Sequence, residues 1–162
     1  MFAVFRTLRD DTTGAALVEA ALLAPLLIVI GFATMDYATF VYQRHVMLTG
    51  VRDAARYLAR TDCSGSGEAT MILNAKNLAV TGQISGGTSR VQAWTIANVQ
   101  VSGTSSNPCV AMAAYTTLRN GIPSLVTVQS TFSYTGLGFV TSLGLPIPAQ
   151  ISVQHTERVI GQ

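Results

Sequence analysis

Charge is scarce in this sequence. Asp, Glu, Lys and Arg make up 11% of the residues, against roughly 25% in ordinary soluble proteins. Apolar residues reach 49%, which argues against a disordered chain and against a freely soluble one. The net charge of +2 is small and dispersed, so the chain lacks the clustered basic surface that binding to nucleic acid requires.

Residues that perform chemistry are scarce as well. The two histidines, His45 and His155, have no Ser, Cys, Asp or Glu at a spacing that indicates a catalytic triad or a metal cluster. Residues 65–67 (GSG) lack the lysine and the further glycines of a phosphate-binding loop. We therefore expect no enzymatic activity, no cofactor and no metal.

The chain has two cysteines, Cys63 and Cys109. Their number and their position after the apolar segment indicate one disulfide formed in an oxidising compartment. Such a bridge would close a loop of about 46 residues and stabilise the fold by roughly 4 kcal/mol in the chain-entropy model. Two unpaired thiols are the alternative.

A long apolar segment occupies residues 15–40, and its only charged residues are Glu19 and Asp36. A membrane-spanning helix needs about 20 mostly apolar residues, so the segment is long enough. We predict a transmembrane helix over residues 15–42.

Two other interpretations of this segment stay open. It could be a buried core helix, although a domain this small has little room to surround one. It could also be a cleavable secretory signal peptide, in which Arg6 and Arg9 form the basic n-region and cleavage occurs near residues 31–34. Glu19 in the apolar part and the polar residues 11–14 before it argue against a signal.

Glu19 is the most informative residue of the segment. An acid in a membrane-spanning helix costs about 2–3 kcal/mol on insertion scales and usually marks a function. Residues 14–19 (GAALVE), followed by an apolar run, resemble the processing motif of type IV prepilins, which are cut after the glycine. The alternative is that Glu19 lies near the helix end and reaches the polar interface.

The resemblance extends over roughly residues 14–60. Glu19, Pro25, the region of Gly31 and Asp36, and residues 51–57 (VRDAARY) resemble the TadE/TadG-like minor pilins, or pseudopilins, of the tight-adherence (Flp-type) pilus system. It implies a leader over residues 1–14 and a partner protein, a prepilin peptidase.

In that family the peptidase would cut between Gly14 and Ala15. The new ammonium group of Ala15 could then pair with the carboxylate of Glu19 on a neighbouring subunit, so that two buried charges compensate each other. The resemblance further implies as partners other pilin or pseudopilin subunits and inner-membrane assembly proteins.

Charge alone does not determine the orientation across the membrane. The side-chain charges of residues 1–14 sum to zero, and Arg44, Arg52, Arg56 and Arg60 follow the span, against the positive-inside tendency. The resemblance implies a cytoplasmic N-terminus and a periplasmic C-terminal domain, anchored in the bacterial inner membrane or carried into the pilus.

Two residues could soften the apolar helix. Pro25 removes a backbone donor, so a kink or a locally melted turn is expected there, and Gly31 is a second soft point. In related pilins such flexibility helps subunits to fit a filament. Membrane helices also tolerate both residues without any such use.

Helical spacing continues beyond the span, with apolar residues on one face: Val41, Leu48, Val51, Ala55 and Leu58. We predict that an amphipathic helix over residues 43–60 extends the spine. Arg52, Arg56 and Arg60 line another face, either solvated or offset by a carboxylate from elsewhere. Small and turn-forming residues at 61–67 should end the helix.

Residues 61–162 should form the exported domain. The pattern predicts a short helix at 68–80, a possible one at 108–119, and strands at 91–101, 125–134 and 149–160. Residues 136–148 are an apolar loop or a contact surface. The fold class is α+β, a long helix packed on a small antiparallel sheet.

The sequence thus favours a pilin-like structural protein that takes part in pilus assembly. The competing hypothesis is a membrane-anchored binding or adhesion module that never enters a filament.

Overall fold

The structure is a computed structural model that describes residues 12–61, 67–103, 125–134, 136–142, 144, 146 and 150–159. The predicted helix at 108–119 lies outside these residues, as do Cys63 and Cys109, so the disulfide stays a prediction.

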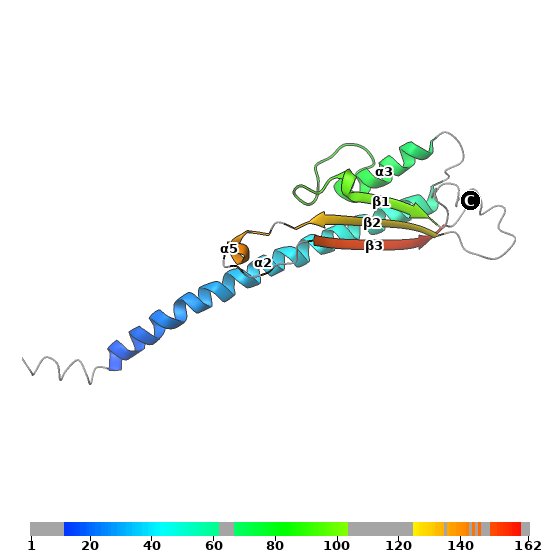
Figure 1. Cartoon of the computed structure of the whole chain (residues 1–162). Helices are drawn as coiled ribbons and strands as arrows, with labels where there is room; N and C mark the ends of the chain where they lie inside the picture. The colour runs from blue at the N-terminus through cyan, green and yellow to red at the C-terminus, as the bar shows by residue number, and fades with distance from the viewer. Residues whose placement is uncertain are drawn as a thin grey trace, which may run out of the picture. The chain divides into compact units, whose positions relative to one another are not determined.

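The element order confirms the α+β class (Figure 1). The elements are α2 (Thr12–Arg60), α3 (Glu68–Thr81), the 3-10 helix η1 (Ile96–Asn98), β1 (Val99–Gly103), β2 (Leu125–Ser133), α5 (Phe139–Ser142) and β3 (Gln150–Arg158).

The chain divides into two compact units. Unit 1 consists of Met1–Thr39 with Gly136–Ile147, and unit 2 of Phe40–Thr135 with Pro148–Gln162. Helix α2 contributes its apolar part to unit 1 and its amphipathic part to unit 2. The predicted limits of the leader, the span and the exported domain remain predictions.

Helix α2 has 49 residues and ends at Arg60, where the sequence predicts its end. The helix is continuous through Pro25 and Gly31. Pro25 has no N–H to donate to the carbonyl of Ala21, so one bond of the helix is missing there. The flexibility expected at these two residues stays a prediction.

The sheet of unit 2 has three antiparallel strands in the order β1-β2-β3. On β2 the predicted alternation is confirmed, because Val126, Val128, Ser130, Phe132 and Tyr134 are all buried. On β3 Ile151 and Val153 are buried. The predicted core positions Phe132 and Tyr134 are therefore correct.

The amphipathic part of α2 packs on this sheet. Its buried face contains Met47, Val51, Ala54, Ala55 and Leu58. Of the predicted apolar stripe, Val51, Ala55 and Leu58 are buried, whereas Val41 and Leu48 are half-buried. At one end of the contact the rings of Phe40 and Tyr134 meet edge to face, with centroids 5.2 Å apart.

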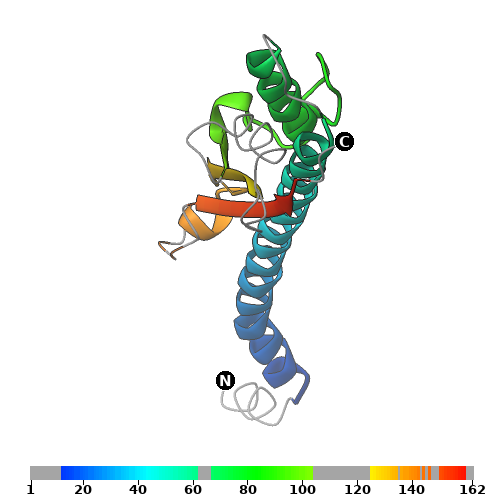
Figure 2. The ribbon, with the colours of Figure 1, turned by 90° about the vertical axis from the view of Figure 1, so that its right-hand side faces the viewer.

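Helix α3 completes the core of unit 2 and lies beside α2 (Figure 2). A Cβ atom on Gly50 would come within 2.2 Å of the carbonyl oxygen of Ala79, so the small residue permits the close approach. Gly82 ends α3 with φ 79°, and its N–H donates to the carbonyl of Leu78. The sequence predicts both this helix and its stop.

The predicted strand at 91–101 is wrong over residues 91–98. Only residues from Val99 onward form β1, and residues 91–98 form turns and η1. Ala93 has a positive φ of 64°, which turns the backbone so that Trp94 enters the core. Its indole N–H donates to the Ser130 hydroxyl at 2.9 Å, and that hydroxyl donates to the carbonyl of Asn98 at 3.0 Å.

Candidate functional site

The candidate site is the N-terminal part of α2, in unit 1. Large apolar side chains on all sides of it are exposed: Leu17, Val18, Leu22, Leu23, Leu26, Leu27, Ile28 and Ile30. Among the described residues one helix, Gly14–Arg60, is long and apolar enough to cross a membrane, and the most apolar stretch of this helix is not buried. This finding disfavours the core-helix interpretation, because lipid or other helices must cover such a surface.

The site residues predicted from the sequence all lie on this exposed surface. Gly14, Ala15, Glu19, Pro25 and Gly31 are exposed. A Cβ atom added at Gly14 or Gly31 would have open space around it. Glu19 has no ion-pair partner within the described part of the chain. A carboxylate on an uncovered apolar helix is available to a group outside the chain.

Asp36 behaves differently from Glu19, although both interrupt the apolar run. Its side chain is 2% exposed, and the backbone N–H of Leu137 donates to Oδ1 at 2.9 Å. The N–H of Val140 lies 3.5 Å from Oδ2. Sequence reasoning assigned no role to Asp36, although an isolated acid in an apolar helix, the signal used for Glu19, also marks it.

An aromatic contact stands one helical turn before Asp36. The rings of Phe32 and Phe139 lie 4.2 Å apart between centroids at an interplanar angle of 31°. Val140, on the short helix α5, is buried. Residues 136–142 therefore cover Asp36 in unit 1, and we call them the capping segment. The sequence left this region open as a loop or a contact surface.

Charged groups of unit 2 meet at the end of β3. Glu157 Oε1 accepts from His155 Nε2 at 2.9 Å and lies 3.5 Å from Arg56 Nε. The hydrogen bond with His155 lowers the pKa of the Glu157 carboxyl, desolvation opposes this, and Arg56 lowers it further. Arg56 is thus offset by a carboxylate from another element, one of the two alternatives considered for the arginine face.

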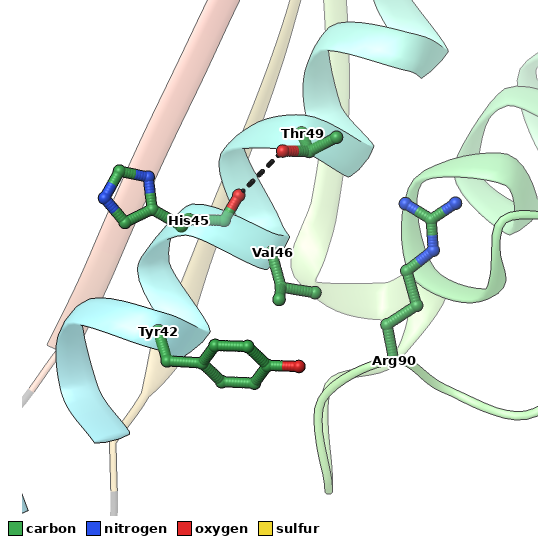
Figure 3. A pocket seen from close by; sticks show the side chains of 5 residues that line it. All are labelled: Tyr42, His45, Val46, Thr49 and Arg90. Atoms are coloured by element: carbon green, nitrogen blue, oxygen red, sulfur yellow. Dashed lines mark hydrogen bonds between the residues drawn. The ribbon is translucent and has the colours of Figure 1, made fainter. Parts of the chain in front are cut away.

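Unit 2 also has an open groove of about 480 Å³, lined by Tyr42, His45, Val46, Thr49 and Arg90. Figure 3 shows the phenol of Tyr42 directed toward the side of Arg90, while the His45 ring points away from it. The Thr49 hydroxyl donates to the His45 carbonyl at 2.9 Å, and Arg90 lies 3.8 Å from Asp53. Thr49 and Arg90 are thus engaged with groups of their own unit.

Within the described ranges, no group of three or more His, Cys, Asp or Glu residues could hold a metal ion. Within the described part of the chain, the candidate site offers an exposed apolar helix and the exposed Glu19 carboxylate, which suit insertion, packing and pairing with a cation.

An exposed apolar helix that continues into a small α+β unit is consistent with a membrane-anchored protein. Residues 14–56 match the model of a family described as TadE-like protein. The family resemblance predicted from the sequence is thereby confirmed over most of α2. The match covers about a quarter of the chain and lies within α2.

Comparisons of the chain with curated proteins and with solved structures gave no match. The match over α2 contains Gly14, Ala15, Glu19, Pro25, Gly31 and Asp36.

Proposed function

We propose that this chain is a pilin-like assembly protein of a tight-adherence pilus, anchored in the bacterial inner membrane by the apolar part of α2. The observation that supports it most is the exposed apolar surface of α2 with an uncovered Glu19. In water such a surface would be strongly unfavourable, at about 25 cal/mol for each Å² of apolar area. Lipid, and in a filament the helices of other subunits, would remove it from water.

The proposal assigns a role to the start of the helix. A prepilin peptidase removes residues 1–14, and the new amino group of Ala15 pairs with Glu19 of a neighbouring subunit. The pairing needs an exposed carboxylate near the new terminus. Glu19 is four residues beyond Ala15 on α2 and is exposed. Its partner must come from outside the described chain or from the processed terminus, since the described residues offer no ion pair to it.

Mass spectrometry of the mature protein from membranes tests the processing step. We expect a chain that begins at Ala15. A chain that retains Met1 would contradict peptidase processing, and a chain that begins beyond Gly31 would show that the apolar segment is a cleaved secretory signal.

Replacement of Glu19 tests the assembly step. We expect Glu19→Ala to abolish or strongly reduce piliation while the protein remains in the inner membrane, because its partner ammonium would be left uncompensated. Thr34→Ala, another exposed residue of the same helix, is the matched control and should leave piliation intact. Normal piliation by Glu19→Ala would favour the anchored binding module.

A further inference from the structure

We propose that the capping segment, residues 136–142, is a second membrane-contacting surface that lies in the lipid interface at the end of the α2 span. The inference rests on the proposed membrane anchorage of α2 and adds a part of the chain that the family match does not reach. Its partner is the phospholipid bilayer itself.

Length places the segment at the interface. From Ala15 to Asp36 α2 rises about 32 Å at 1.5 Å per residue, close to the hydrocarbon thickness of about 30 Å. The segment contacts α2 at Phe32 and Asp36. If Ala15 lies at one membrane surface, these contacts therefore lie at the other.

The chemistry of the segment suits that position. The sequence has no Asp, Glu, Lys or Arg from residue 120 to residue 156. Leu137 is 58% exposed, and Phe32, whose ring contacts that of Phe139 on the segment, is 46% exposed. Exposed apolar side chains thus occur both on the spanning helix and on the segment docked against it, and lipid at this depth would cover both.

The burial of Asp36 supports the same conclusion. Asp36 is the only charged residue between Glu19 and Arg44, and a bare carboxylate at this depth would be costly. The N–H groups of Leu137 and Val140 are directed at its two oxygens, so the segment shields the acid from lipid while Asp36 holds the segment against the helix. At this end of the span the acid is then shielded from the bilayer.

Depth-dependent fluorescence quenching in the full chain tests this. The protein is reconstituted into vesicles of phosphatidylethanolamine and phosphatidylglycerol, with lipids brominated either near the headgroup or near the methyl end of the acyl chain. Leu137→Trp reports on the segment, Leu27→Trp on the span and Leu73→Trp, at an exposed site on α3, on a position outside the bilayer. The emission that each variant adds to that of Trp94 is measured.

We expect the indole introduced by Leu137→Trp to lose more emission to the shallow bromines than to the deep ones. Leu27→Trp should show the opposite order, and Leu73→Trp should lose almost nothing. If Leu27→Trp is quenched and Leu137→Trp is not, the capping segment does not touch lipid, although the anchor stands. If Leu27→Trp is not quenched either, the membrane anchorage itself fails.

Two further outcomes would overturn the proposal. Equal or stronger quenching of Leu137→Trp by the deep bromines would place the segment in the hydrocarbon core and not at its surface. Quenching that appears only after the protein is diluted in lipid would mean that a second copy of the chain covers the segment at higher density.

Discussion

Removal of the Asp36 carboxylate should release the capping segment from α2. The N–H of Leu137 donates to this carboxylate at 2.9 Å, and a hydrogen bond to a charged group contributes about 1.5–3 kcal/mol. The contact from Val140 is 3.5 Å long, beyond the usual range of 2.7–3.2 Å, so it adds little. Asp36→Ala should therefore weaken the docking by about 2 kcal/mol, roughly a 30-fold change in the equilibrium between docked and released segment.

Amide hydrogen exchange on the full chain in vesicles measures this equilibrium. When exchange proceeds through local opening, its rate follows the open population. We expect the Leu137 amide to exchange roughly 30-fold faster in Asp36→Ala than in the unmodified chain. Asp36→Asn, which keeps one acceptor oxygen without the charge, should give an intermediate rate.

The amides of the sheet and the variant Thr34→Ala serve as references for this experiment. The Thr34 hydroxyl donates to the carbonyl of Gly31 at 2.8 Å within α2, so its loss should not affect the segment. Unchanged exchange at Leu137 in Asp36→Ala would refute the docking role of the carboxylate. Equal acceleration in both variants would show a general loosening of α2.

Two predictions concern unit 2. Ser130→Ala removes the acceptor of the Trp94 indole N–H, and Trp94 is 1% exposed. The free energy of unfolding should therefore fall by about 1–3 kcal/mol, which denaturation followed by Trp94 fluorescence measures. Ser152→Ala, at an exposed position, is the control and should have almost no effect. The pKa of Glu157 is lowered from 4.5 by its hydrogen bond with His155, so its stabilising contribution is present above pH 4.5 and is lost as the pH falls through the lowered pKa. Denaturation at a series of pH values should show less loss of stability on acidification in Glu157→Gln, and an identical pH dependence would contradict the assignment.

Patterns that repeat along a few neighbouring residues predicted much of the fold. The alternation on β2, the helical spacing of Val51, Ala55 and Leu58, and the stop at Gly82 are local signals, and each leads to the observed element. These signals work because strand and helix periodicities decide which side chains meet the core.

The strand predicted at 91–101 is wrong over residues 91–98 for a physical reason. Trp94 and Val91 are buried, as strand residues would be. Here, however, a turn buries them: Ala93 has a positive φ, and Trp94 donates a hydrogen bond to Ser130, 36 residues away. An apolar run indicates burial and does not distinguish a strand from a turn that inserts one large side chain.

The candidate site shows the same difference between local sequence signals, which are readable, and long-range contacts, which are not. Gly14 and Glu19 form a motif that is complete within six residues, so the sequence reveals it. The partner of Asp36 lies 101 residues further along the chain and consists of backbone N–H groups, which no residue type identifies. Sequence reasoning could mark Asp36 as an acid that needs compensation, but it could not find the segment that supplies it.

The two acids of the apolar helix therefore have separate tasks. Asp36 is buried and accepts hydrogen bonds from the chain's own backbone, so an outside group cannot reach it unless the capping segment is released. Glu19 is exposed and has no ion-pair partner among the described residues, and under the proposed function a neighbouring subunit compensates it. A charge that is satisfied within the subunit stabilises that subunit, whereas one left open on an apolar surface makes insertion costly until a partner binds. Under the proposed function that cost favours assembly, which gives the role in assembly to Glu19 and not to Asp36.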